Sequence, residues 1–483
     1  MSDPTPLQAQ AHKLLDELRA GQQAWASLPV QERARRLNEA GKAMLAGAPE
    51  LSKLLSEETG RPEAESWSLE TVGIADLFSY WCKHGPALLQ PRPGKIPALD
   101  MPGKKARVER RPRGVIAVIS PWNYPASLPM RSLVPALLAG NAVALKPSEV
   151  TPRSGKWLIE RLRAHLGPVV GLLEGAAEAG SALIEARPDM VIFTGSTRTG
   201  RKVAVACAER GIACELELGG KDCAVVLDDA DIQRAAAGIA WGILHNGGQD
   251  CASVERLAVH ARVAELFERA LVKHMEQAAP YVSDLITEAQ RHIVTRQLEE
   301  ARTLGASFPT GGATGAGKIP PTLATHLPRH AALWREESFG PVAAMVVCAN
   351  DEELIAAAND TTYGLGTSIW TKDLKRGERL AAKARSGMVW INNHAFTGAV
   401  PDLPWVGTGD SGSGITNSPE ALLHMTTPHL IAVDTSTAPE PWWYPYTDNM
   451  LSLMKAAVAR QRYGGVGATL GALSALRARN KDF

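Results

Sequence analysis

The sequence predicts an α/β protein built around a doubly wound parallel sheet, and three observations support this fold class. Between residues 114 and 218, short apolar runs alternate with segments of helical length. Residues 114–119 form a continuous apolar run, which is typical of a strand buried on both faces of a parallel sheet. Polar and glycine-rich motifs follow these runs directly, and ligands of such sheets bind beyond the carboxyl ends of the strands.

Residues 5–90 predict a layer of helices. Leu14, Leu15 and Leu18 recur on one helical face. Three prolines mark the expected breaks between helices: Pro29, Pro49 and Pro62. The next residues, 91–112, are rich first in proline and then in arginine, so we expect no core strand there.

The alternation in residues 114–218 predicts five strands with helices between them. The strands are expected at 114–119, 141–145, 169–173, 190–194 and 212–218. The helices are expected at 127–139, 154–165, 181–185 and 197–208. The glycine-flanked residues 175–180 are interpreted as a plain turn.

The rest of the chain contains the same two kinds of segment. Strands are expected at 256–260, 341–348, 363–369, 387–392 and 423–433. Helices are expected at 232–244, 263–277, 289–304, 351–359, 451–463 and 469–479. The last two helices have mostly alanine at their apolar positions, so we expect them to pack on this subunit or a neighbouring one. A membrane-surface role is the less favoured alternative.

Composition excludes several classes of function. The chain has 483 residues and a net charge of +1, which predicts two or three domains and argues against a nucleic-acid partner. Its six cysteines show no paired or metal-type spacing, which predicts free thiols, no metal site and a reducing, cytoplasmic location. The first residues show no signal-peptide pattern, and no apolar run reaches membrane-spanning length.

One cysteine stands in a distinctive setting. Residues 245–253 (His-Asn-Gly-Gly-Gln-Asp-Cys-Ala-Ser) place Cys251 in a glycine- and amide-rich turn after an expected helix. A partly exposed thiol near backbone N–H groups that favour the thiolate can act as a nucleophile. The alternative is that Cys251 is a small buried hydrophobe. His245 and His260 are interpreted as ordinary surface or core residues, because no triad-like pattern links them to the cysteine.

Five motifs accompany this cysteine. They are residues 120–125 (Ser-Pro-Trp-Asn-Tyr-Pro), 146–149 (Lys-Pro-Ser-Glu), 193–196 (Phe-Thr-Gly-Ser), 215–221 (Glu-Leu-Glu-Leu-Gly-Gly-Lys) and 336–341 (Glu-Glu-Ser-Phe-Gly-Pro). Their order and spacing closely resemble the aldehyde dehydrogenase superfamily, and the resemblance covers residues 7–433. It implies a Rossmann-like doubly wound cofactor domain, an α/β catalytic domain and a small β element for bridging and oligomerisation.

The resemblance also implies how the chain divides. Residues 1–90 and 113–218 would form the NAD-binding domain, and residues 219–422 the catalytic domain. Residues 91–112 and 423–433 would be the bridging strands that pair with another subunit, in a homodimer or homotetramer. Residues 434–483 would be a helical tail. One segment departs from the family pattern: in residues 404–414, Trp405, Val406 and Gly409 stand where the family usually has Phe-Gly-Gly and a lysine, which puts the packing of that loop in doubt.

The resemblance assigns the chemistry to three residues. Cys251 would be the nucleophile, Glu217 the general base for thioester hydrolysis, and Asn123 part of the oxyanion hole. Glu217 lies between two leucines, so its pKa is expected to be raised, which suits proton abstraction near neutral pH. Alternatively, Lys221 could form a structural pair with it, and Asn123 could simply end a strand.

The cofactor is expected to be NAD, with NADP possible. The family's phosphate-binding Gly-Ser pair matches Gly195 and Ser196, which precede an expected helix. Lys146 and Glu149 match the pair that holds the adenosine ribose, and a carboxylate there would repel the extra phosphate of NADP. The other residues with matching cofactor positions are Ser120, Trp122, Gly219, Glu337 and Phe339.

The substrate is expected to be a small-molecule aldehyde, and the residues expected to line its tunnel are Tyr124, Ser127, Arg131 and Asp250. Arg131 lies two helical turns beyond Asn123, and some semialdehyde-oxidising family members hold a substrate carboxylate with an arginine there. Two other functions remain open. One is a catalytically inactive homologue that acts as a scaffold, and the other is a CoA-acylating dehydrogenase.

Overall fold

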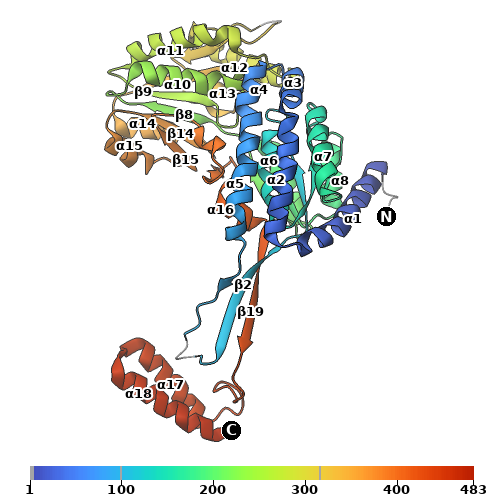
Figure 1. Ribbon diagram of the computed structural model, residues 1–483. Helices are drawn as coiled ribbons and strands as arrows, with labels where there is room; N and C mark the ends of the chain where they lie inside the picture. Colours follow the sequence, from blue (N-terminus) through green and yellow to red (C-terminus); the bar gives the residue numbers. More distant parts are fainter. Residues whose placement is uncertain (1–4, 98–100, 315–316) are drawn as a thin grey trace. The chain divides into compact units, whose positions relative to one another are not determined.

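The computed structural model describes residues 5–97, 101–314 and 317–483 (Figure 1). Residues 1–4, on which the expected lack of a signal peptide partly rests, lie outside the described residues. The chain forms two compact units, one of Met1–Gln90 with Arg110–Thr427 and one of Pro91–Glu109 with Pro428–Phe483. In the described part of the chain, no helix is both long and apolar enough to cross a membrane.

The first 90 residues form the expected helices. They are α1 (Pro6–Ser27), α2 (Val30–Ala46), α3 (Ala48–Thr59), α4 (Glu63–Ser66) and α5 (Val72–Leu88), with one π-helical turn (Trp67–Thr71) before α5. All three proline breaks are confirmed. Pro29 caps α2, Pro49 lies in the first turn of α3, and Pro62 precedes α4. Leu15 and Leu18 are fully buried, as their helical spacing predicts.

A five-stranded parallel sheet confirms the predicted fold class (Figure 1). Its strands are β3 (Val115–Ile119), β4 (Ala142–Lys146), β5 (Val170–Leu172), β6 (Met190–Thr194) and β7 (Ala213–Glu217). The order is β5-β4-β3-β6-β7, so the chain reverses its winding direction between β3 and β6. Such a switch point leaves a crevice beyond the carboxyl ends of the two central strands.

The helices that connect these strands are α6 (Ser127–Ala139), α7 (Pro152–Leu166), α8 (Ala177–Glu185) and α9 (Thr197–Ala208). One expectation was wrong. Residues 175–180 are not a plain turn, because α8 already begins at Ala177. The two glycines suggested a loop, but Ala176, Ala177 and Ala179 favour the helix, and Gly180 lies buried within it.

A seven-stranded sheet follows, in the order β10-β11-β12-β9-β8-β14-β15. Its strands are β8 (Asp222–Val226), β9 (Val254–His260), β10 (Ser307–Thr310), β11 (Thr322–Thr325), β12 (Val342–Cys348), β14 (Gly366–Trp370) and β15 (Met388–Ile391). Neighbouring strands are parallel except for β10 and β11. The sequence pattern did not predict β8, β10 or β11. Division of this unit at residue 218 into cofactor and catalytic domains stays a prediction.

The helices around this sheet are α10 (Ile232–Leu244), α11 (Ala264–Ala278), α12 (Glu288–Thr303), α13 (Ala332–Arg335), α14 (Asp351–Ala358) and α15 (Leu374–Ala381). Helix α16 (Ser418–His424) packs instead against α5 and α6. Short strands lie between them at β13 (Tyr363–Gly364), β16 (Trp405–Val406), β17 (Thr408–Gly409) and β18 (Ile415–Thr416). Helices α13, α15 and α16 are further elements that the sequence pattern did not predict.

The second unit contains exposed strands and the tail. Strands β1 (Arg92–Pro93), β2 (Lys104–Pro112) and β19 (Thr426–Asp434) form one sheet, and most of their residues are exposed or half-buried. β19 begins three residues later than expected, because Leu423 belongs to α16. Helices α17 (Asp448–Tyr463) and α18 (Gly465–Arg479) pack against each other. Arg479 is buried and donates hydrogen bonds to the backbone oxygens of Pro441 and Trp443, in the segment between β19 and α17.

Candidate active site

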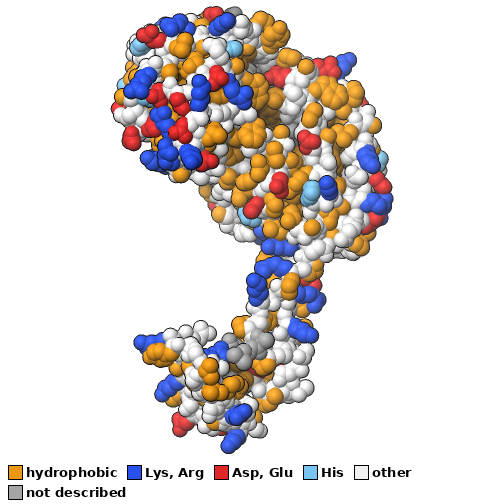
Figure 2. Space-filling model, turned by 60° about the vertical axis from the view of Figure 1, so that its left-hand side comes forward, with side chains coloured by type: hydrophobic (Ala, Val, Ile, Leu, Met, Phe, Trp, Pro, Cys, Tyr) orange, Lys and Arg blue, Asp and Glu red, His pale blue; other side chains and the backbone are white. Residues whose placement is uncertain are grey.

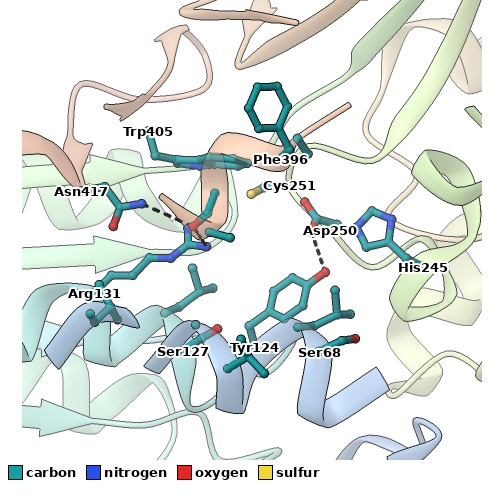
Figure 3. A pocket seen from close by; sticks show the side chains of 18 of the residues that line it. Ser68, Tyr124, Ser127, Arg131, His245, Asp250, Cys251, Phe396, Trp405 and Asn417 are labelled. Atoms are coloured by element: carbon teal, nitrogen blue, oxygen red, sulfur yellow. Dashed lines mark hydrogen bonds and ion pairs between the residues drawn. The ribbon is translucent and has the colours of Figure 1, made fainter. Parts of the chain in front are cut away.

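A cavity of about 380 Å³ brings the expected thiol and substrate residues together. Cys251, Tyr124, Ser127, Arg131 and Asp250 all line it (Figure 3). Most of the remaining wall is apolar or aromatic, with side chains from four regions of the chain: Leu69, Val72, Leu77, Leu128, Trp241, Phe396 and Trp405. The cavity therefore combines one nucleophile with a largely apolar wall, which is the usual composition of a small-molecule site.

The turn that carries Cys251 depends on residues with left-handed backbone conformations. Helix α10 ends at Leu244, and a short 3-10 turn follows in which Asn246 and Gly247 have φ of 51° and 62°. At Gly248, a Cβ would lie 2.1 Å from the carbonyl oxygen of Gly340, so only glycine fits there. The turn leaves Cys251 half-buried at the cavity wall.

The electrostatic setting of Cys251 differs from the one expected. Burial raises the pKa of the thiol well above its ordinary value, and the carboxylates of Asp250 and Glu217 raise it further, while Arg131 opposes them. The expectation that the turn favours the thiolate is therefore wrong for this structure. Burial and the surrounding carboxylates together disfavour the thiolate, so the thiol needs added positive charge or a base to ionise near neutral pH.

Asn123 lies against the cysteine turn. Its side chain is buried, and Nδ2 donates to the backbone oxygen of Gln249 at 3.1 Å. In return, Asn246 Nδ2 donates to the backbone oxygen of Asn123 at 3.1 Å. Strand β3 already ends at Ile119, so Asn123 does not end that strand. These contacts hold its amide beside the thiol-bearing turn, while its oxyanion role stays a prediction.

Glu217 is the last residue of β7 and is buried. Its Oε1 has no hydrogen-bond partner among the residues that the structure describes. Burial raises the pKa of Glu217 to about 7, although contacts with Thr416 act in the opposite direction. Lys221 pairs with Glu255 and contacts Ser338 instead of Glu217, so the structural Lys221–Glu217 pair was a wrong alternative. A buried carboxylate with a free oxygen and this pKa can accept a proton near neutral pH.

The loop with the atypical sequence packs beside Glu217. Ser413 and Gly414 donate backbone hydrogen bonds to Leu216 at 3.0 and 2.8 Å, and Leu218 donates to Ser411 at 3.0 Å. At Gly412, a Cβ would lie 2.1 Å from the Leu216 oxygen. The departure from the family pattern therefore leaves the loop tightly paired with the end of β7.

The expected phosphate and ribose residues lie at the carboxyl ends of β3, β4 and β6. Ser196 caps α9 by accepting a hydrogen bond from the N–H of Thr199, and Gly195 immediately follows β6. Lys146 ends β4, and its Nζ lies 3.1 Å from a carboxylate oxygen of Glu149. Ser120 follows β3, and its buried hydroxyl lacks a partner in the described part of the chain.

This donor set fits a dinucleotide. A helix N-terminus behind Gly195 and Ser196 provides backbone N–H groups for phosphate oxygens. Glu149 carries an ionised carboxylate: partial burial would raise its pKa, but backbone and Lys146 hydrogen bonds lower it overall. Half of its side chain is exposed (52%), so a ribose could reach it. These groups lie at the switch point of the five-stranded sheet.

A buried ion pair holds the turn with Phe339, one of the residues expected to bind the cofactor. The Glu255 carboxylate accepts backbone hydrogen bonds from Ser338 and Phe339, each at 2.7 Å, and pairs with Lys221. Phe339 has φ of 51° and meets Trp122 edge-to-face at 5.5 Å. Glu255 was not predicted, although a charged residue in an apolar strand indicates a buried pair or a functional site.

Glu337 lies next to this ion pair. Its Oε1 accepts the backbone N–H of Gly220 at 2.9 Å, and burial raises its pKa to about 8. At Gly219, a Cβ would lie 2.3 Å from the Glu337 carboxylate. Gly219 is thus needed for the close approach of its own backbone to the Glu337 carboxylate. A cofactor role for Gly219 or Glu337 stays a prediction.

Arg131 extends from α6 into the cavity and is already engaged. Its Nη2 donates to the backbone oxygen of Gly398 at 2.9 Å, and its guanidinium lies 5.4 Å from the centre of the Trp405 ring (Figure 3). Asn417 Nδ2 approaches the same oxygen at 3.4 Å. Arg131 therefore ties the loop before Trp405 to α6, and any substrate carboxylate must use its remaining N–H groups.

His245, interpreted as an ordinary surface or core residue, is buried, and whether it has a functional role stays a prediction. It lines the cavity, and its Nε2 lies 3.1 Å from Oδ2 of Asp250, the residue beside Cys251. Tyr124 donates to the same oxygen at 2.5 Å. Tyr124 and Asp250 are separated by more than a hundred positions in the chain, so the sequence offered no local signal for this cluster. His260, by contrast, is buried in β9 and does not line the cavity.

The comparison with protein families agrees with this geometry. The model of the aldehyde dehydrogenase family matches residues 4–431. The chain belongs to this family. It is therefore an oxidoreductase that acts on aldehydes, and members of the family use NAD or NADP.

Several relatives match most of the length of this aldehyde dehydrogenase. It is 36% identical to 4,4'-diapolycopene aldehyde oxidase of Methylomonas sp, over 92% of this chain and 85% of that protein. It is 34% identical to a Mycobacterium ulcerans protein with the provisional name succinate-semialdehyde dehydrogenase [NADP(+)] 2, over 86% and 83% of the two chains. The structure of PnpE in complex with nicotinamide adenine dinucleotide shares 31% identity and a TM-score of 0.84, covering 89% of this chain and 91% of that one. PnpE comes from Pseudomonas sp. WBC-3.

Proposed function

We propose that this enzyme oxidises an aldehyde to a carboxylic acid through a thioester on Cys251. The proposal rests mainly on one observation: the Cys251 thiol faces a largely apolar cavity, and the buried carboxylate of Glu217 is close enough to raise the pKa of that thiol. A nucleophile and a base near the same cavity meet the minimum for covalent catalysis with hydrolysis.

In the first step, the Cys251 thiol loses its proton to water, its sulfur bonds to the aldehyde carbon, and the carbonyl oxygen takes up the negative charge. One N–H of Asn123 is used by Gln249, which leaves the second N–H for this oxygen, together with the backbone N–H of Cys251. The nicotinamide cofactor, when bound, accepts the hydride that leaves the substrate carbon. The product of this oxidation is a thioester on Cys251.

In the second step, Glu217 removes a proton from water, and the resulting hydroxide attacks the thioester carbon. The carbon–sulfur bond breaks, the acid leaves, and Cys251 is released. The pKa of about 7 for Glu217 suits this task, because the group can both accept and release a proton near neutral pH.

We infer that the preferred substrates are uncharged and apolar. The aromatic and aliphatic wall favours such aldehydes, and the relative named diapolycopene aldehyde oxidase is consistent with this. Arg131 could hold a substrate carboxylate, as the relative named succinate-semialdehyde dehydrogenase would suggest. We favour the apolar class because Arg131 is bound to Gly398 and stacked near Trp405.

The function is tested by the formation of reduced cofactor with short aliphatic, long-chain, aromatic and ω-carboxylate aldehydes, each with NAD and with NADP. Turnover with production of the acid supports the proposal, and the order of kcat/KM values identifies the substrate class. Failure with every aldehyde and both cofactors would contradict it. Turnover that requires free CoA and yields an acyl-CoA would show the acylating reaction instead.

Arg131→Met tests the carboxylate alternative directly. If apolar aldehydes are preferred, kcat/KM for a long-chain aldehyde and for an ω-carboxylate aldehyde should fall together, by less than about tenfold, because only the loop contact is lost. A selective loss of about a hundredfold for the ω-carboxylate aldehyde would assign the anchoring role to Arg131. Lys156→Met, at an exposed position on α7, is the matched control.

Glu149→Gln tests the cofactor preference. Removing the carboxylate removes its repulsion of a 2′-phosphate, so the ratio of kcat/KM for NADP over NAD should rise by about tenfold or more. Steady-state kinetics with both cofactors measures this ratio. The matched control is Glu57→Gln, an exposed glutamate that pairs with Arg153. An unchanged ratio would show that Glu149 does not select the cofactor.

We also infer the domain roles. Residues 1–90 and 113–218 would bind the cofactor. The residues expected to hold its phosphates and ribose lie at the carboxyl ends of the strands of their sheet. Residues 219–422 would carry the chemistry on the turn before β9. The unit with β1, β2 and β19 would serve oligomerisation, since its strands are largely exposed.

A further inference from the structure

His245, Asp250 and Tyr124 form one buried hydrogen-bonded cluster beside the thiol. His245 Nδ1 lies 2.9 Å from the backbone oxygen of Trp241, and Nε2 lies 3.1 Å from Asp250 Oδ2. The same Oδ2 accepts the Tyr124 hydroxyl at 2.5 Å, and Oδ1 accepts the backbone N–H of Ala252 at 2.7 Å. Figure 3 shows the three side chains side by side along the cavity wall.

The partners of this cluster determine its protonation state. A backbone carbonyl can only accept, so His245 Nδ1 must carry a proton. Asp250 accepts hydrogen bonds at both oxygens, which favours its ionised form. An ionised Asp250 also can only accept, so Nε2 must carry a proton too. The ring is therefore an imidazolium, and the pair is a buried ion pair.

Two further features support this charge state. The Trp241 ring stacks on His245 with a centroid distance of 4.3 Å and an interplanar angle of 10°, which suits a cation above an indole. Burial alone would lower the pKa of His245, but the contacts with Asp250 outweigh it and raise the pKa overall. Conversely, burial would raise the pKa of Asp250, and His245 with Tyr124 lowers it overall.

Other charged groups face the cluster from neighbouring elements. Glu65 of α4 also raises the pKa of His245, and Arg61 lies 5.5 Å from the centre of the Tyr124 ring but is paired with Glu70. His394 contacts the backbone oxygen of Ala252, and burial lowers its pKa to about 4, so it stays neutral. Around the thiol itself lie the three carboxyl groups Asp250, Glu217 and Asp222, opposed by Arg131.

We propose that His245 is a positioning residue for the Cys251 reaction: its imidazolium offsets part of the negative charge of the Asp250 carboxylate beside the thiol. Without that cation, the Asp250 carboxylate would oppose thiolate formation at the neighbouring residue more strongly than it does in the wild type. The same balance keeps the wall acceptable to uncharged aldehydes. The inference rests on Cys251 being the nucleophile, as in the proposed function.

The test measures the ionisation of Cys251 without any substrate. The full chain is alkylated with iodoacetamide across a pH series, and the labelled fraction of the Cys251 peptide is measured by mass spectrometry. In His245→Gln, the amide keeps a hydrogen-bonding group but not the positive charge. The midpoint, the pH at which the alkylation of Cys251 is half-maximal, should therefore rise by about one unit. The alkylation rate near neutral pH should therefore fall about tenfold.

The double variant His245→Gln with Asp250→Asn removes both charges and should restore a midpoint near that of the wild type. Asp250→Asn alone should lower the midpoint. The matched control is His260→Gln, a buried histidine away from the cavity, which should leave the midpoint unchanged. A midpoint unchanged in His245→Gln, or raised equally in the double variant, would overturn the proposal. If His245→Gln does not fold, an unchanged midpoint in Asp250→Asn would overturn it.

This result can be separated from a failure of the proposed function. Wild-type enzyme that is fully alkylated at Cys251 and still oxidises aldehydes would contradict the role of the cysteine. The charge balance would still be measurable, because the alkylation profile does not depend on turnover.

Discussion

Replacing Cys251 by serine should lower kcat for aldehyde oxidation by about 10⁴-fold or more while cofactor binding is retained. The pKa of a serine hydroxyl lies far above that of a thiol, so the hydroxyl stays protonated near neutral pH and the covalent step is lost. The substitution changes one atom at a half-buried position, and the turn is held by contacts of Asn246 and Gln249 that it leaves untouched. Steady-state kinetics gives the rate, and isothermal titration with NAD gives the binding.

Cys82→Ser provides the matched control, because Cys82 is also a half-buried free cysteine but lies on α5 outside the cavity. Its activity should stay within about twofold of the wild type. If Cys251→Ser keeps substantial turnover, or if Cys82→Ser loses as much activity, the assignment of the nucleophile is wrong.

Replacing Glu217 by glutamine should block the second half of the reaction rather than the first. Without a base to activate water, the thioester persists, so the variant should release about one equivalent of reduced cofactor in a burst and then turn over 10²–10⁴-fold more slowly, as general-base loss typically costs about this much. Rapid-mixing absorbance measures the burst, and intact-protein mass spectrometry detects the acyl group on Cys251. Absence of both the burst and the acyl group would show that Glu217 acts before thioester formation.

The pH profile gives a second readout of Glu217. The base works only as the carboxylate, and its pKa is about 7, so it is protonated and inactive below that pH. In the wild type, the rate of thioester hydrolysis should therefore rise with pH and level off above about 7, whereas in Glu217→Gln this rise should vanish. Glu215→Gln is the matched control: Glu215 is a buried glutamate two residues away that pairs with His424, and its replacement should leave the rise in place.

The sequence allowed prediction of most of the cofactor-binding part of the fold. Continuous apolar runs such as Val115–Ile119 and Met190–Thr194 leave little choice of structure, and their boundaries were close to those observed. The second sheet was harder. β8 directly follows the Gly-Gly-Lys motif and begins with the charged residue Asp222, and β10 and β11 are short and paired through an irregular register. Such strands form because neighbouring strands are present, and this is a property of the tertiary structure.

Motifs located the candidate site, but they did not describe its electrostatics. Cys251 and Tyr124 were predicted to share a cavity, and they do. The ion pair of His245 with Asp250 and the ion pair of Lys221 with Glu255 were not predicted, because each depends on which side chains the folded backbone brings together. The same holds for the raised pKa of Cys251, which is set by carboxylates from different strands and turns. A single sequence shows which kinds of residue are present, but not the electrostatic field that they produce once the chain is folded.

The missing side chain at Gly248 has a consequence for engineering this enzyme. Because its Cα packs directly on the backbone of Gly340, the turn with the thiol and the turn with Phe339 are joined as one rigid block. Neither turn can be moved to enlarge the cavity without displacing the other. A variant for bulkier aldehydes should therefore be sought outside these two turns, at Phe396, whose half-exposed side chain also lines the cavity.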